Sequence, residues 1–91
     1  MIITRHDVAQ KLIEFLHHRV TLAELVDWAE RAMMEADFDE NDYQTLRDIV
    51  SRLGLSDVRA FGMSWEDCEN FLHRLGYHVS VVISEAPAVV A

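Results

Sequence analysis

The feature that most constrains the fold of this chain is a helix-start signal that occurs four times. In each case a Thr, Asp or Ser is followed three residues later by an acidic residue: Thr4 and Asp7, Thr21 and Glu24, Asp39 and Asp42, Ser64 and Asp67. The first side chain can accept a backbone N–H of the first helical turn, and the acid is favoured at the positive helix end. The strict capping-box pattern is met only by Thr21 and Glu24. We therefore expect four helices.

Apolar side chains recur at intervals of three and four after each start signal, which is typical of a helix with one buried face. This spacing predicts helices over residues 5–17, 22–35, 40–53 and 65–75. Gly54 and Gly76 follow the third and fourth helices, and glycine most readily adopts the left-handed conformation that ends a helix. A short helical turn is also expected over residues 56–61. The predicted fold class is mainly α, a compact four-helix domain.

Beyond Gly76 the apolar period changes from helical spacing to strict alternation. Apolar residues occur at every second position: Tyr77, Val79, Val81 and Ile83. This alternation predicts a short C-terminal β-strand over residues 77–83. A lone strand cannot satisfy its own backbone, so its partner is either residues 1–3 or the same strand of a second chain. Residues 84–91 contain Pro87 and show no period, so we expect a flexible tail there.

The size and composition fit one domain, which we place at residues 1–83. The chain has 91 residues, of which 51% are hydrophobic. Its single cysteine, Cys68, rules out an intrachain disulfide and a metal site made of several cysteines. The first residues lack the pattern of a secretory signal, and the apolar runs are far shorter than the roughly 20 residues that span a bilayer. We expect a cytoplasmic protein that is not embedded in a membrane.

The negative charge is concentrated in one part of the chain. The sequence has 16 acidic and 8 basic residues, a net charge of −8, which disfavours binding to nucleic acid. Nine acidic and two basic residues lie between Glu24 and Asp48, so this segment alone carries −7. Such a field attracts a basic protein partner and speeds association. The alternative is that this face only keeps the protein soluble.

Within this segment, Trp28 flanks the apolar stripe of the second helix, where it suits either the core or a binding hot spot. We expect the following residues to contact a partner: Asp27, Trp28, Glu35, Asp37, Asp39, Glu40 and Asp42.

The residues give no support for catalysis, a cofactor or a metal site. The run from Asp37 to Asp42 partly matches a calcium-binding loop, but Asp42 stands where that loop needs glycine. His17 and His18 are adjacent, so on a helix they point in different directions and cannot easily bind one ion. Cys68 falls on the inward face of the last helix, where a thiol behaves as a small apolar group. We therefore expect a protein that is not an enzyme and needs neither metal nor cofactor.

The stretch from Leu12 to Leu25 contains the end of a helix, a short turn and the start of a second helix. The second helix opens with Thr21 and Glu24, and an apolar residue follows the glutamate. This arrangement resembles small all-helical bacterial immunity proteins of the colicin D type, which inhibit a cognate nuclease toxin by covering its basic active site. The resemblance lies in about the first third of the chain. It implies a basic nuclease toxin as the partner.

Three functions follow as hypotheses. The leading one is a non-enzymatic protein-binding domain that presents its acidic surface to a basic protein, as an immunity protein does. The first alternative is a small structural or assembly module that forms a homodimer through the strand at 77–83. The second alternative is a small metal-dependent protein that uses His and Asp side chains, which predicts that metal stays bound through purification.

Overall fold

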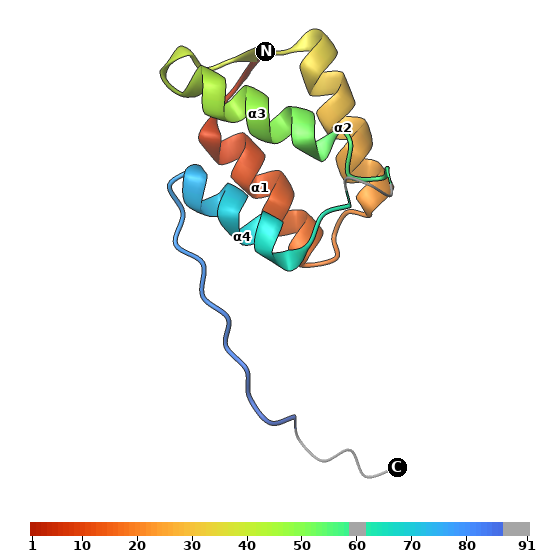
Figure 1. Ribbon diagram of the computed structural model, residues 1–91, viewed down its shortest axis with the longest axis vertical. Helices are drawn as coiled ribbons and strands as arrows, with labels where there is room; N and C mark the ends of the chain where they lie inside the picture. Colours follow the sequence, from red (N-terminus) through yellow and green to blue (C-terminus); the bar gives the residue numbers. More distant parts are fainter. Residues whose placement is uncertain (59–61, 87–91) are drawn as a thin grey trace.

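Four α-helices form the body of the part of the protein that the structure describes, as the sequence predicts (Figure 1). The computed structural model describes residues 1–58 and 62–86. Within these residues the helices are α1 (Arg5–Leu16), α2 (Leu22–Glu35), α3 (Tyr43–Leu53) and α4 (Trp65–Arg74). No helix in this described part has the length and apolar character needed to cross a membrane. The mainly α, four-helix class is confirmed.

Three of the four start signals form reciprocal capping boxes. Thr21 Oγ1 accepts the N–H of Glu24 at 3.1 Å, while Glu24 Oε1 accepts the N–H of Thr21 at 3.0 Å. The same two-bond arrangement precedes α1 and α4: Thr4 with Asp7, and Ser64 with Asp67. The shorter aspartate carboxylate also completes the box, so the strict sequence pattern is too narrow for this chain.

The remaining start signal, Asp39 with Asp42, produces a different local structure. The Asp39 side chain accepts the N–H of Asn41 at 3.0 Å and caps a short 3₁₀ helix, η1 (Glu40–Asp42). Helix α3 begins only at Tyr43, and Asp42 precedes it without a side-chain capping bond. The predicted start at residue 40 is therefore too early, because the first turn is the tighter 3₁₀ form.

A short parallel sheet joins the N-terminus to the connection between α2 and α3. Strand β1 (Ile2–Ile3) pairs with β2 (Asp37–Phe38), so that Ile2 lies opposite Asp37 and Ile3 lies opposite Phe38. The N–H of Asp37 donates to the Met1 carbonyl at 3.0 Å, and the N–H of Asp39 donates to the Ile3 carbonyl at 2.9 Å. Residues 1–3 thus have a strand partner that the alternation pattern did not reveal.

The predicted C-terminal strand over residues 77–83 is wrong. These residues carry no strand, and residues 1–3, their expected partner in the same chain, pair with β2 instead. Burial alternates only at the start of this segment, where Tyr77 and Val79 are half-buried against the core. The chain then leaves the helical body as an extended segment (Figure 1). Residues 84–86 are exposed, and residues 87–91 of the predicted tail lie outside the described residues.

The core lies between the helices, and the sheet adds Ile3 to it and packs Phe38 against it. Ile3 of β1 is buried together with side chains from all four helices, among them Leu12, Leu25, Leu46 and Leu72. Helix α2 makes its most extensive contact with α3. Burying a leucine or isoleucine stabilises a fold by about 1.5–3 kcal/mol, so these residues position the surrounding loops.

The two glycines predicted to end helices have different conformations. Gly76 follows α4 with a φ of +89°, the left-handed conformation expected there. Gly54 follows α3 with a φ of −64°, so the expected left-handed conformation is wrong at that position. The chain continues from Gly54 as a turn through residue 57, and residues 59–61 of the helical turn predicted over 56–61 lie outside the described residues.

Candidate functional site

A surface groove of about 890 Å³ lies between the β1–β2 sheet, the end of α2 and the start of α3. Its position follows from the local sequence. Helix α2 ends at Glu35, and Ala36 is extended with φ −102° and ψ 154°, so the chain passes directly into β2. Asp39 then caps η1, which turns the chain into α3. The connection between α2 and α3 therefore forms one border of the groove.

Apolar and aromatic side chains form one part of the groove. Ile2, Met33, Phe38 and Tyr43 all line it. The rings of Phe38 and Tyr43 meet edge to face, with centroids 6.2 Å apart and an interplanar angle of 71°. Ile2 and Tyr43 are more than a third exposed. The groove therefore offers apolar surface to a partner as well as charge.

Three of the predicted contact residues line this groove together. Asp37 and Glu40 are exposed and Asp39 is half-buried. Arg47 is the basic residue of the lining, and its Nη1 donates to the Tyr43 hydroxyl at 3.4 Å. The charged side chains of the groove therefore sum to −2, so its local field stays negative.

Glu35 lies beside the groove rather than in it. It lines a neighbouring hollow with Met1, Ile3 and Trp28. In the described part of the chain, no ion pair joins Glu35, Asp37, Asp39 or Glu40 to a base. We use the name acidic groove for the groove, with Asp37, Asp39 and Glu40 in its lining, together with Glu35 at its border. Their charges are therefore available to a partner.

Two other predicted contact residues are engaged on α2. Asp27 Oδ2 lies 3.2 Å from Arg31 Nη2, one helical turn away. Trp28 is half-buried and packs against the core, with the Lys11 ammonium 6.0 Å from its ring centroid. The cations Lys11 and Arg31 offset the negative charge near these two residues. Asp27 and Trp28 therefore do not belong to the acidic groove.

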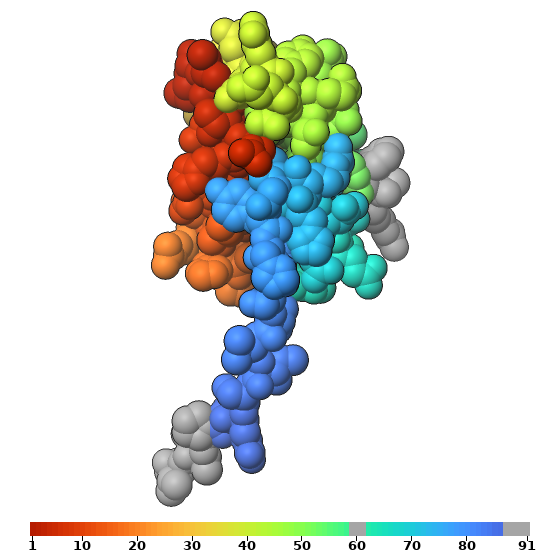
Figure 2. All heavy atoms as spheres, turned by 90° about the vertical axis from the view of Figure 1, so that its left-hand side faces the viewer, coloured from red at the N-terminus to blue at the C-terminus, as the bar shows by residue number. Residues whose placement is uncertain are grey.

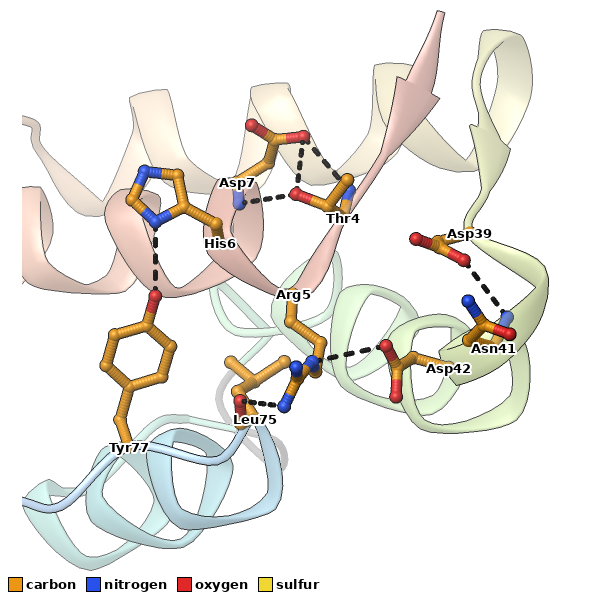
Figure 3. Close-up of polar contacts among 9 residues, drawn as sticks. All are labelled: Thr4, Arg5, His6, Asp7, Asp39, Asn41, Asp42, Leu75 and Tyr77. Atoms are coloured by element: carbon orange, nitrogen blue, oxygen red, sulfur yellow. Dashed lines mark hydrogen bonds and ion pairs between the residues drawn. The ribbon is translucent and has the colours of Figure 1, made fainter.

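Asp42 belongs to a partly exposed junction between segments of the chain instead (Figure 3). Its Oδ2 lies 3.2 Å from Arg5 Nε. Arg5 Nη1 also donates to the Leu75 carbonyl at 3.4 Å, and next to it His6 Nδ1 lies 3.1 Å from the Tyr77 hydroxyl. The junction joins the start of α1 to the chain that follows α4. The carboxylate of Asp42 is therefore paired within the chain, in contrast to the carboxylates that line the groove.

Two further features concern metal binding and the cysteine. The described residues contain no group of three or more His, Cys, Asp or Glu side chains placed to hold a metal ion. Cys68 is buried, and this burial, together with the charge of Asp67, raises the pKa of its thiol above the ordinary value. A thiol in this state is a poor nucleophile.

The apolar part of the groove is the feature that sequence reasoning missed. Met33 and Tyr43 fall on the apolar stripes of their helices, so their spacing reads as core. Ile2 shows no pattern at all, because a two-residue strand is too short to have one. The available signal was Phe38, a large aromatic residue set between Asp37 and Asp39 in an otherwise polar run.

No protein-family model matches the chain, and comparison with curated proteins and with solved structures gives no significant match.

Proposed function

We propose that this protein is a non-enzymatic protein-binding domain whose acidic groove binds a basic protein. The observation that carries the proposal is the combination, within the described residues, of exposed apolar side chains and carboxylates without ion pairs in one groove. Protein interfaces commonly have an apolar centre with a polar rim, and Ile2 and Tyr43 beside Asp37 and Glu40 provide both parts. Four acids within six residues of chain also attract a cationic surface over a distance.

The proposed partner class is a basic nuclease toxin. The support for this class is the resemblance of residues 12–25 to immunity proteins, together with the charge of the groove. Nucleases bind phosphates with cationic side chains, so carboxylates inserted among those side chains compete with the substrate. Asp37 and Glu40, the more exposed acids of the groove, are the residues proposed to make these contacts.

Titration calorimetry against a catalytically inactive, basic nuclease toxin domain tests this function. A neutralised variant replaces the four acids with their amides: Glu35→Gln, Asp37→Asn, Asp39→Asn and Glu40→Gln. A control variant makes the same change in net charge elsewhere: Asp57→Asn, Glu66→Gln, Glu69→Gln and Glu85→Gln. An equally basic protein that is not a nuclease serves as the specificity control.

We expect wild type to bind the nuclease domain and to inhibit the active form of that enzyme. The neutralised variant is expected to bind about tenfold or more weakly, which corresponds to about 1.4 kcal/mol. The control variant is expected to bind like wild type, and higher salt is expected to weaken the wild-type complex. Equal binding by both variants, or binding that does not respond to salt, contradicts the proposal.

A further inference from the structure

The segment from Ser80 to Ala86 projects from the body without covering its apolar side chains. Val81 is 59% exposed, and Val82 and Ile83 are each 90% exposed. These three consecutive β-branched residues favour strand structure, yet they pair with no strand in the described chain. Exposed apolar segments with free backbone groups are sites where another chain adds.

The direction of this segment is fixed where it leaves the body. The Tyr77 hydroxyl contacts His6 Nδ1 at 3.1 Å, and Val79 packs against the core. Both views show the segment running away from the body, with the N-terminal residues at the opposite end of the molecule (Figures 1 and 2). Reaching β1 of its own chain would require these contacts to break.

Strand β1 has an open edge. The carbonyls of Met1 and Ile3 both face β2, where they accept hydrogen bonds. Because successive backbone groups alternate along a strand, the N–H and C=O of Ile2 face the other way. Within the described residues no hydrogen bond occupies these groups. Met1 is 95% exposed and Ile2 is 63% exposed, so this edge is also apolar.

Two hollows beside this edge can receive side chains. One of about 260 Å³ is lined by Met1 and Ile3 and by the last turns of α2, from Trp28 to Glu35. The second, of about 470 Å³, is lined by all three N-terminal residues, Met1 to Ile3, by Trp28 and by the side chains along one face of α1. Trp28 thus borders both hollows. A strand laid along β1 places alternate side chains over Trp28 and the intervening ones beside Ile2.

We propose that residues 80–84 of one copy add as a strand to the open edge of β1 in a second copy. Val81 and Ile83 alternate with Val82, so one set of apolar side chains meets the hollows at Trp28 and the other meets Ile2. Seven residues, 80–86, span roughly 23 Å when extended, enough for a strand of ordinary length. The exchange is reciprocal and gives a twofold dimer with two identical contacts. Most of the acidic groove lies on the β2 side of the sheet, although it shares Ile2 with the dimer contact and Glu35 with one of the hollows. The tail variant described below leaves both residues unchanged, so it tests the dimer separately from the proposed function.

Sedimentation of full-length variants tests this arrangement. The tail variant, Val81→Asp with Ile83→Asp, places charge in the adding strand. The edge variant, Ile2→Pro, removes the outward N–H of Ile2, and the β1–β2 bonds stay because they use other groups. Ile2→Lys is a second edge variant that keeps every backbone N–H and opposes strand addition by its charge. Circular dichroism and urea unfolding check that each variant is folded.

We expect wild type to be a dimer and each variant alone to have half its mass. An equimolar mixture of the tail variant and an edge variant is expected to form dimers again, because one intact tail meets one intact edge. Edge variants that dimerise like wild type would show that tails pair with each other, which overturns the proposal. A monomeric wild type, or a mixture that stays monomeric, overturns it as well. Equal behaviour of Ile2→Pro and Ile2→Lys excludes local unfolding as the cause.

Discussion

Arg5 Nε lies 3.2 Å from the Asp42 carboxylate, and this pair links the first turn of α1 to the residue just before α3. The same guanidinium donates to the carbonyl of Leu75, beyond the end of α4 (Figure 3). One side chain therefore holds three segments that are far apart in the sequence. The Asp42 carboxylate is therefore already paired within the chain, so we assign it to this junction and not to the acidic groove.

Replacing the partners of this junction is expected to affect stability and leave partner binding unchanged. Because the ion pair is partly exposed, Asp42→Asn is expected to lower the free energy of unfolding by at most about 1 kcal/mol. Arg5→Ala is expected to cost more, since it also removes the bond to Leu75. Urea unfolding of both variants and of the double variant gives the coupling energy. A coupling of zero, or a loss of nuclease binding in Asp42→Asn, contradicts this assignment.

The two glycines after α3 and α4 are expected to respond oppositely to alanine. At Gly76 the φ is +89° and an added Cβ would lie 2.7 Å from Arg5 Nη1. Gly76→Ala is therefore expected to destabilise the fold by about 1–3 kcal/mol. At Gly54 the backbone is right-handed and an added Cβ meets only ordinary contacts, the nearest at 3.5 Å. Gly54→Ala is the matched control, expected to be neutral or stabilising by up to about 1 kcal/mol. Thermal unfolding compares them, and equal destabilisation would be inconsistent with the two conformations.

The capping carboxylates are expected to make stability depend on acid pH. The pKa of Glu24 is lowered chiefly because its carboxylate accepts the backbone N–H of Thr21, and the pKa of Asp67 is lowered chiefly by the N–H of Ser64. A carboxyl with a lower pKa in the folded state stabilises the fold above its unfolded pKa. This stabilisation is lost as the pH falls through the folded pKa, below the usual carboxyl range near pH 4.

Urea unfolding between about pH 6 and pH 2.5 measures this dependence. The amide variants Glu24→Gln and Asp67→Asn are expected to lose stability at neutral pH and to show a shallower decline with acid. Glu66→Gln is a suitable control, because it lies in the same helical turn as Asp67 and forms no capping bond. If the free energy of unfolding declines with acid as steeply in both capping variants as in wild type, these carboxylates do not contribute to the pH dependence of stability.

The thiol of Cys68 is expected to be inert in the folded protein. It is 2% exposed and its pKa is raised, so both access and thiolate formation are disfavoured. A disulfide reagent at about pH 8 is expected to label Cys68 only after unfolding by urea. Asn70→Cys, in the exposed part of α4, provides a reactive thiol for comparison. Similar labelling rates for the two thiols in native protein would contradict the buried position of Cys68.

The helices were predictable because their causes are local. A cap such as Ser64 with Asp67 acts over three residues, and each apolar stripe repeats within one helix. The β1–β2 pairing was not predictable, since Ile2 and Asp37 are 35 residues apart and two-residue strands carry no period. The predicted strand at 77–83 failed for the same reason. Its alternation was real, but alternation does not identify a partner.

The candidate site was predictable in its charge and not in its geometry. The run from Glu35 to Glu40 is visible in the sequence and remains without ion pairs in the described structure. Asp27 and Arg31 are four residues apart on one helix, so their pairing follows from spacing. The pairing of Asp42 with Arg5 depends on how α1 packs beside α3, which no local rule gives.

The β1–β2 pairing has a consequence for the order in which the molecule folds and opens. It closes a loop that contains all of α1 and α2, yet it consists of two short strands. Its entropic cost falls once those helices have packed, so we expect it to form last and to open first. Hydrogen exchange at the amides of Asp37 and Asp39 is therefore expected to be faster than in the middle of α2. A protein bound in the acidic groove would slow this opening, and so stabilise the kinetically weakest part of the domain.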